Sequence, residues 1–220
     1  MMLPNLKSAV YGLVLALVIS GCSHDIPLNP NLPESAGAPK IAETVGVYMS
    51  SDFKTHKHSD SQYGDTWVFP LGAASASLMP KAFEQAFAKT VPVDALPPSG
   101  DLPGDIAAVI EPQIQDFSFT LPFIKTGTYS SVIVYRFRML GMEGTPFASW
   151  TVEGTGAKPG EIGFEFARWP GEAADLAMED AAHKFIDGVA MVPEVRRWLQ
   201  DRGAKISNFE PKEPIMVVYK

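Results

Sequence analysis

The residue with the clearest potential for chemistry is Cys22, the only cysteine in a chain of 220 residues. One thiol cannot close a disulfide within the chain, and a structural zinc site takes four ligands, so neither role fits it alone. Its surroundings are more informative, because it follows the small residues Ser20 and Gly21 at the end of an apolar run. Small residues at that place are typical of the site where a secretory signal is cut. We therefore expect Cys22 to be processed and modified.

The segment before Cys22 has the composition of a signal peptide, with the positive charge of Lys7 ahead of the apolar run. A membrane-spanning anchor is the alternative, but the run contains about 12 residues, whereas a helix that crosses a bilayer needs about 20. The motif Ile19-Ser20-Gly21-Cys22 resembles the lipobox of bacterial lipoproteins. The resemblance implies that the Cys22 thiol is diacylated, that the signal 1–21 is cut between Gly21 and Cys22, and that the new N-terminus is acylated.

An acylated Cys22 would attach the protein to a membrane. Each buried CH₂ group contributes about 0.8 kcal/mol, and two acyl chains already give a stable anchor. Ser23 follows the cysteine. By resemblance to enterobacterial sorting, the absence of aspartate at this position favours the outer membrane. We expect a lipid-anchored protein on the periplasmic face of that membrane, with the bilayer as its first partner.

The stretch 22–40 predicts an extended tether between the anchor and the folded part. It contains four prolines and few large apolar residues, the prolines being Pro27, Pro30, Pro33 and Pro39. A proline-rich segment of this length extends by roughly 3.1 Å per residue and would reach about 50 Å. The alternative is an ordered segment that lies across the domain.

Other residues with catalytic or metal-binding potential do not form a convincing site in the sequence. His56 and His58 have a spacing that could present two imidazoles on one side of a strand, but zinc needs three or four ligands and their neighbours are polar. His183 and His24 are interpreted as boundary and solvated histidines. The chain lacks the Gly-x-Ser-x-Gly, P-loop and Gly-x-Gly-x-x-Gly motifs. We expect no catalytic residue, no metal, no cofactor and no enzymatic activity.

The charge balance argues against a nucleic-acid partner. Residues 22–220 carry 17 basic and 25 acidic side chains, a formal net charge of −8, once Lys7 is removed with the signal. Proteins that bind nucleic acids carry a basic patch instead. The partners expected are therefore a membrane and either an envelope protein or further copies of this chain.

Aromatic side chains in two irregular segments form a candidate interface. Such groups can anchor a protein contact or touch lipid. The alternative is that they cap the core. The candidates are Phe117, Phe119, Phe123, Phe164, Phe166 and Trp169.

Hydrophobic periodicity predicts the secondary structure that positions these residues. Short strand-like runs occupy 43–49 and 66–69, with a polar loop at 50–65 between them. Helical spacing covers 72–90 and resumes near 172, and a short helix at 194–202 begins after Pro193. Three further strand-like runs cover 105–121, 132–140 and 147–156. The first contains Pro112, which favours a bend or a sheet edge.

This order predicts an α+β fold with a mostly antiparallel sheet, two long helices packed on one face, and a short C-terminal helix. The single domain is expected over 41–203, followed by a C-terminal tail at 204–220. The arrangement resembles YajG-type lipoproteins, the curli secretion lipoprotein, the Pel polysaccharide lipoprotein and the accessory lipoproteins of lipid-transport ABC systems. The resemblance depends on the lipobox, the strand opening Val45-Gly46-Val47, Gly72 before a helix, two paired strands (Val132–Tyr135 and Trp150–Gly154) and the alanine-rich helix Ala173–Ala190.

The resemblance implies a non-enzymatic accessory protein for envelope assembly, export or transport, and it brings no catalytic residues. A lipid- or glycan-binding module that uses a groove between helices and sheet is the first alternative. A hydrolase is a distant one. Fold alone does not choose between them.

Overall fold

A five-stranded mixed sheet forms the centre of the molecule. The structure is a computed structural model and describes residues 23–34, 39–99, 102–122, 126–161 and 167–203. The strands of the large sheet follow the order β5-β2-β6-β7-β8. Their bounds are Phe87–Pro92, Ile41–Val47, Ala108–Thr120, Thr126–Leu140 and Pro146–Glu161. Strands β6, β7 and β8 are antiparallel, whereas β2 runs parallel to both β5 and β6.

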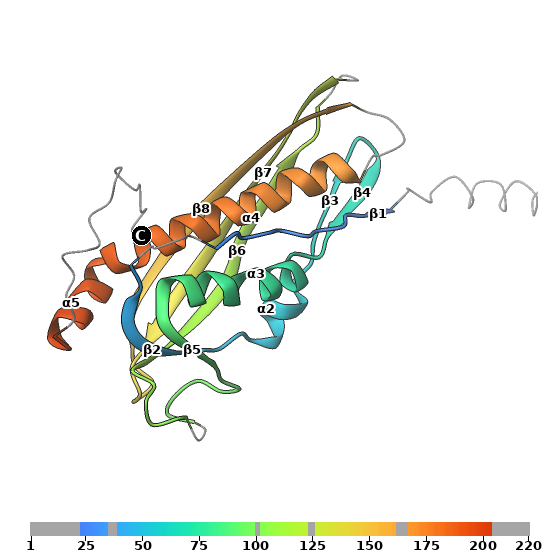
Figure 1. Ribbon diagram of the computed structural model, residues 1–220. Coiled ribbons are helices and arrows are strands. Elements are labelled where there is room, and N and C mark those ends of the chain that lie inside the picture. Colours follow the sequence, from blue (N-terminus) through green and yellow to red (C-terminus); the bar gives the residue numbers. More distant parts are fainter. Residues whose placement is uncertain (1–22, 35–38, 100–101, 123–125, 162–166, 204–220) are drawn as a thin grey trace, which may run out of the picture.

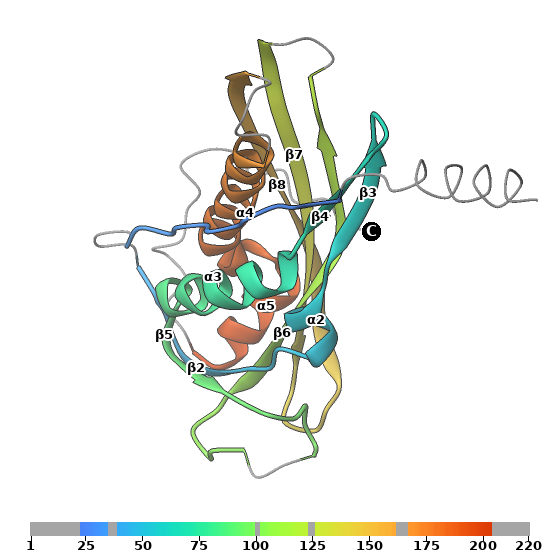
Figure 2. The same ribbon diagram turned by 90° about the vertical axis from the view of Figure 1, so that its right-hand side faces the viewer.

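Two long helices, α3 (Leu71–Ala86) and α4 (Arg168–Gly188), cover one face of this sheet (Figure 1). Turned by a quarter, the molecule shows both helices on the same side of the strands (Figure 2). The one-turn helix Val189–Met191 and α5 (Pro193–Asp201) follow α4, and the short α2 (Ser51–Thr55) precedes α3. The predicted α+β class, with two long helices on one face and a short C-terminal helix, is confirmed. None of the described helices is long and apolar enough to cross a bilayer.

A second sheet of three strands, the small sheet, packs beside the large one. Its order is β1-β4-β3, with bounds Ser23–Asp25, Asp65–Phe69 and His58–Gln62. The polar loop predicted at 50–65 is wrong, because this segment contains α2 and β3. The reversal at Tyr63 and Gly64 has positive φ at both residues, which suits the tight turns that join antiparallel strands.

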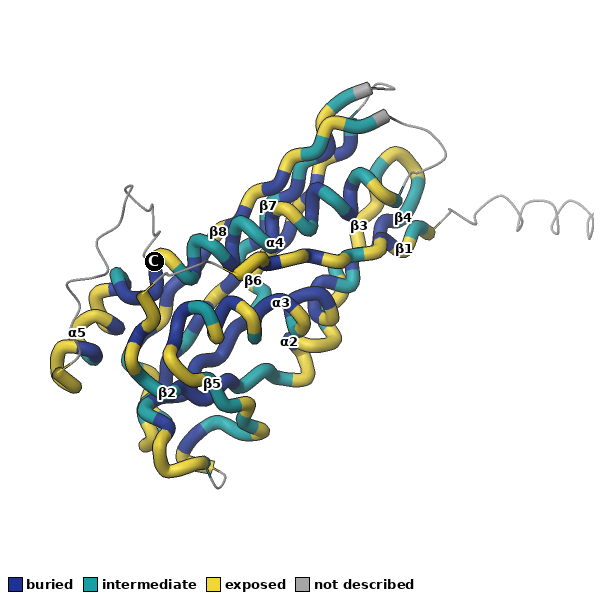
Figure 3. Tube along the Cα trace, in the orientation of Figure 1, coloured by how far each residue is buried: buried dark blue, intermediate teal, exposed yellow. Residues whose placement is uncertain are grey.

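The alternation of residues in β7 puts every second side chain in the core. Ile133, Tyr135, Phe137 and Met139 are buried, while Arg136 between them is exposed. Phe137 pairs with Trp150 of β8, and their rings lie 5.6 Å apart. The Phe185 ring of α4 lies 4.5 Å from the Phe137 ring, so sheet and helix share one interior. Figure 3 shows the buried residues concentrated where α3 and α4 meet the strands.

Helix α4 approaches β8 closely because two glycines face it. A Cβ atom at Gly154 would collide with the Ala177 carbonyl, and one at Gly156 would collide with the Ala173 carbonyl. Alanine on the helix and glycine on the strand therefore let the two backbones come together. The alanine-rich helix in the sequence has this packing role.

The predicted end of α3 needs correction, but the sheet edge predicted at Pro112 does not. Helix α3 ends at Ala86 rather than near residue 90, and Phe87 begins β5, which pairs with β2. Pro112 lies at a local sheet edge, as predicted, because the pairing of β6 with β2 ends at Ile110 while the pairing with β7 continues. The irregularity in β6 falls between Ile114 and Asp116. The Ile110 carbonyl accepts a hydrogen bond from the Tyr48 N–H, just after β2. Pro112 lies two residues further along β6 and faces the same side of the strand, where the pairing with β2 has ended.

The tether predicted for 22–40 is also wrong over 23–34, a segment we call the N-terminal strap. The strap begins with β1 and continues across α4, and its Ile26 and Leu32 are buried in the core cluster. The strap is therefore an ordered segment that lies across the domain, which was the alternative to a tether. The predicted boundary at residue 41 does not separate the strap from the folded domain. Proline has no backbone N–H to donate, and it is tolerated in the strap because this segment makes few backbone hydrogen bonds of its own. The signal 1–21, Cys22 and the tail 204–220 lie outside the described residues.

Candidate functional site

The small sheet begins at the residue next in sequence to Cys22. Ser23 pairs with Thr66, His24 with Trp67 and Asp25 with Val68, in parallel register. The Ile26 N–H then donates to the Val68 carbonyl at 2.9 Å. The described chain therefore enters its fold immediately at residue 23, with no free spacer between residue 22 and the first strand.

An aromatic cluster joins the small sheet to β6. The Phe69 ring lies 4.9 Å from Phe117 and 4.7 Å from Phe119, and the Trp67 ring lies 6.3 Å from Phe119. Phe117 is 4% exposed and Phe119 is 7% exposed. These two candidate interface residues thus cap the core, which was the alternative, because the β3–β4 hairpin covers them.

Of the four remaining candidate interface residues, only Trp169 lies among the described residues. Trp169 is half-buried at the start of α4 and packs against Gly160. The Arg168 guanidinium lies 4.8 Å from the Trp169 ring centre. Phe123, Phe164 and Phe166 lie outside the described residues. Trp169 is therefore the described member of the set that keeps contact with solvent.

Two carboxylates of α4 hold the strap through its backbone. The Asn29 N–H donates to both oxygens of Asp175, at 2.9 and 3.1 Å. The Asn31 N–H donates to Glu179 at 2.6 Å. Since an extended segment leaves its N–H groups unpaired, acceptors one helical turn apart supply the missing partners. Nothing in the proline pattern predicted these contacts, because they depend on residues about 146 positions away.

Asp175 is the titratable group most affected by this docking. Burial raises the pKa of Asp175 to about 6, and the negative charges of Glu179 and Glu172 act in the same direction. The hydrogen bond from Asn29 opposes them. One turn earlier, hydrogen bonds from Lys158 and Arg168 lower the pKa of Glu172. The strap therefore covers a carboxylate that binds a proton more readily than usual.

His58, one of the two histidines of the candidate metal pair, and His24, which was expected to be solvated, both pack against aromatic rings. The His58 ring lies 5.0 Å from Phe117, edge to face, and burial lowers the pKa of His58. The His24 ring lies 4.8 Å from Trp67, and its Nε2 is 3.5 Å from an Asp65 oxygen. Among the described residues no three side chains of the metal-binding types come together.

Ser75, in the run of small residues in the first half of α3, also has a structural role. The Ser75 and Tyr135 hydroxyl oxygens lie 2.7 Å apart in the core. Burial raises the pKa of the Tyr135 phenol well above its usual range. A neutral tyrosine and a serine without an adjacent base do not form an activated nucleophile. This pair satisfies two buried polar groups that the sequence did not connect.

An open hollow lies between β8 and α4. Its volume is about 380 Å³, and its lining includes Thr155, Leu176, Glu179, Asp180 and His183. The Thr155 N–H donates to Asp180 at 2.8 Å, and the Lys184 ammonium donates to the Glu153 carbonyl at 3.0 Å. Helix side chains therefore bond to part of the outer edge of β8. The lining of the hollow combines the apolar side chain of Leu176 with the polar groups of Glu179, Asp180 and His183.

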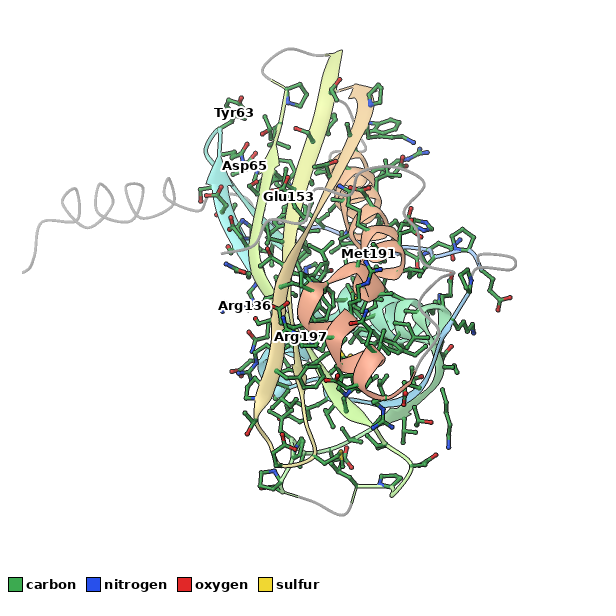
Figure 4. The ribbon with its side chains drawn as sticks, turned by 90° about the vertical axis from the view of Figure 1, so that its left-hand side faces the viewer. Tyr63, Asp65, Arg136, Glu153, Met191 and Arg197 are labelled. Atoms are coloured by element: carbon green, nitrogen blue, oxygen red, sulfur yellow. The ribbon has the colours of Figure 1, made fainter. Side chains whose placement is uncertain are left out.

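The other face of β6, β7 and β8 carries a buried ion pair. The Arg138 Nε donates to Glu111 at 2.8 Å, and a second guanidinium nitrogen contacts the same oxygen. Arg136 is exposed on this face, and Glu153 is exposed on the neighbouring strand. Figure 4 labels both on the strands. Glu111 and Arg138 are 27 positions apart, so no local pattern in the sequence connects them.

Comparisons with known proteins give structural neighbours only. No protein-family model and no curated protein matches the sequence. A Xanthomonas campestris protein of family DUF330 shares 10% identity at a TM-score of 0.49, covering 82% of this chain and 99% of that chain. A minor lipoprotein from Acinetobacter baumannii shares 8% identity at a TM-score of 0.43, covering 70% of this chain and 94% of that chain. At these values neither resemblance carries a conclusion about function.

Proposed function

We propose that the protein is a lipid-anchored accessory lipoprotein of the bacterial envelope, attached through acylated Cys22 and acting without catalysis. The observation that carries this proposal is the lipobox-like Ile19–Cys22 sequence after a short apolar run. The run is too short for a membrane-spanning helix. Anchoring through acyl chains places the folded part outside the cytoplasm, where an accessory protein of envelope assembly, export or transport would act.

Protein contacts are the proposed mode of action. Ser75 bonds to Tyr135 in the core and His58 packs against Phe117, so the contacts of these two residues are structural, which supports this mode. The face of β6–β8 opposite the helices offers a surface for a partner. It presents the exposed Arg136 and Glu153 among small polar side chains. The partner is an envelope protein or a further copy of this chain.

A glycan-binding role is the second candidate, and the hollow between β8 and α4 favours it. Thr155, Asp180 and His183 place a hydroxyl, a carboxylate and an imidazole around one open space. These groups can exchange hydrogen bonds with sugar hydroxyls. Loss of glycan retention in a His183→Ala variant, with protein partners retained, would favour this role.

The test is an affinity purification of the tagged, acylated protein from detergent-solubilised envelopes. A stoichiometric envelope protein or a defined homo-oligomer is expected, and it should be weakened by Arg136→Glu. The matched control Arg197→Glu alters an exposed arginine of α5 and should retain the partner. A monomer without a stoichiometric partner would overturn the accessory role.

The outer membrane is the proposed location. Density-gradient separation of the two envelope membranes is expected to place the protein in the outer-membrane fraction. A Ser23→Asp variant should shift toward the inner membrane if sorting follows the enterobacterial pattern. Recovery of the unaltered protein in the inner-membrane fraction would contradict the location.

A further inference from the structure

The first strand of the fold begins next to an exposed turn. Because β1 runs parallel to β4, its first residue, Ser23, lies beside Thr66, near the start of β4. Strand β4 begins directly after the Tyr63-Gly64 turn. Neighbouring strands lie about 4.8 Å apart, and one residue extends a strand by about 3.3 Å. Cys22 is covalently joined to Ser23, so its sulfur is attached within about 10 Å of this turn.

The start of β1 is fixed to the rest of the molecule. The Ile26 N–H bonds to Val68, the His24 ring packs on Trp67, and Asn29 bonds to Asp175 of α4. A chain fixed by these contacts has no slack with which to move the acyl group away. An anchor at Cys22 would therefore hold the small sheet against the leaflet that contains the acyl chains.

The turn has the chemistry of a membrane–water boundary. Tyr63 is 64% exposed, more than the other exposed large hydrophobic side chains of the described residues, Met142 and Leu176. Its hydroxyl oxygen lies 3.5 Å from the Leu121 carbonyl. Tyrosine is enriched at membrane interfaces because its ring is apolar and its hydroxyl is polar.

The charges near the turn indicate which lipid property matters. Asp65 lies 3.5 Å from the His24 imidazole, and Asp60 is exposed on β3. Carboxylates at this end would not be attracted to an anionic surface. Contact should therefore depend on the acyl anchor and on Tyr63, and it should not need anionic lipid.

We propose that the Gln62–Asp65 turn rests on the headgroup layer of the leaflet that holds Cys22, with Tyr63 at the boundary. This proposal depends on the acylation in the proposed function. It orients the molecule with the small sheet toward the membrane and α5 away from it. Figure 1 shows the β3–β4 turn and α5 at opposite ends of the molecule. The turn and α5 are also well separated in Figure 4, which labels Tyr63 and Arg197.

The test compares two labelled positions in the acylated protein. Acylation consumes the Cys22 thiol, the only one in the chain, so a single introduced cysteine can carry an environment-sensitive fluorophore. Ser61→Cys places the fluorophore on an exposed residue of β3, two residues before Tyr63, and leaves Tyr63 in place. Met142→Cys is the matched control. Met142 lies just past the end of β7, and about 30 Å of that strand separates this end from Ser131, which pairs with Phe119 beneath the small sheet. The vesicles contain phosphatidylethanolamine, phosphatidylglycerol and a headgroup-attached nitroxide quencher.

Several-fold stronger quenching at position 61 than at position 142 is expected. A flexible Gly/Ser insertion of about 10 residues after Cys22, beginning with serine, has an r.m.s. length of roughly 17 Å and should remove the difference. Equal quenching at both positions, with the protein floating with the vesicles, would overturn the proposal while leaving the anchor intact. Failure to float would overturn the proposed anchor, and this proposal with it. Unchanged circular dichroism verifies that both variants are folded.

Discussion

The large and small sheets are built in different ways. The large sheet has long strands whose inward side chains meet α3 and α4, and the rings of Phe137 and Phe185 are fully buried. The small sheet has strands of three to five residues and is assembled from the N-terminal strap and a separate hairpin. It lies over the end of β6. The large sheet thus forms its core with the helices packed on it, whereas the small sheet forms only when segments distant in the sequence pair with each other.

This difference has a consequence for local stability. Regions with few buried contacts open at lower free energy than the core. The strap contributes Ile26 and Leu32 to the core cluster, while its outer residues are exposed. We expect the strap and the small sheet to open before the large sheet does. The anchored end would then be the less stable part of the molecule.

The largest effect should come from the large sheet. Phe137→Ala removes a ring that lies 4.5 Å from Phe185 and 5.6 Å from Trp150. Truncation of a buried phenylalanine costs about 3–5 kcal/mol. Denaturant unfolding should show this loss for the whole domain. The control Leu176→Ala, at an exposed position of α4, should stay within about 0.5 kcal/mol.

The strap gives a smaller and more local effect. Ile26→Ala should reduce the free energy of strap opening by about 2–4 kcal/mol. Hydrogen exchange should become faster at the amides of β1 and the strap and change little in β7. Leu28→Ala, at a half-buried strap position, is the matched control and should have a smaller effect. Equal acceleration in both sheets would show that they open together and would remove the distinction between them.

The close approach of α4 to β8 gives the third prediction. Gly156→Ala introduces a methyl group against the Ala173 carbonyl, so the helix must shift. Overpacking of this kind costs about 1–3 kcal/mol. Gly104→Ala is the control, because a Cβ there meets no atom within 4 Å. Equal stability of both variants in denaturant unfolding would mean that the strand and helix are not tightly packed.

The smallest effect concerns pH. Because the pKa of Asp175 is raised to about 6 in the folded state, the folded protein binds this proton more readily than the unfolded chain. The stabilising contribution is fully present below the unfolded pKa and is lost as the pH rises through about 6. Asp175→Asn should remove this pH dependence, an effect on the order of 1–2 kcal/mol after solvent screening.

A matched control for the pH effect lies on the same helix. Hydrogen bonds from Lys158 and Arg168 lower the pKa of Glu172, so its contribution is present at neutral pH and lost as the pH falls. Glu172→Gln should therefore remove a dependence of opposite sign. Denaturant unfolding of both variants and the original protein, between about pH 4 and about pH 7.5, measures the two slopes. An unchanged slope in Asp175→Asn would contradict the assignment.

The sequence predicted the large sheet better than the small one, for a physical reason. The alternation in β7 and the stripe of α4 are local signals, so Tyr135, Phe137 and Met178 could be assigned to the core. The small sheet has no such signal. Its strands are short and polar, and β1 becomes a strand only because β4 is available for pairing.

The candidate residues divide in the same way. The sequence identifies Phe117 and Phe119 as candidate interface residues, but only the β3–β4 hairpin that covers them shows that they are buried. Asp175 and Glu179 could not be connected to the strap, because carboxylates on a helix surface have no local pattern that predicts an acceptor role. Tyr63 was missed within a segment interpreted as a loop, although its place before Gly64 is compatible with a hairpin turn.

The central claim is that the protein is held in the envelope by an acylated Cys22. Mass spectrometry of the N-terminal peptide, from protein isolated with its native envelope, tests it most directly. If Cys22 is acylated, the peptide starts at Cys22 and carries the mass of three acyl chains, and it disappears in a Cys22→Ala variant. An N-terminal peptide that still contains residues before Cys22, or one that starts at Cys22 without acyl groups, would show that Cys22 is not the anchor.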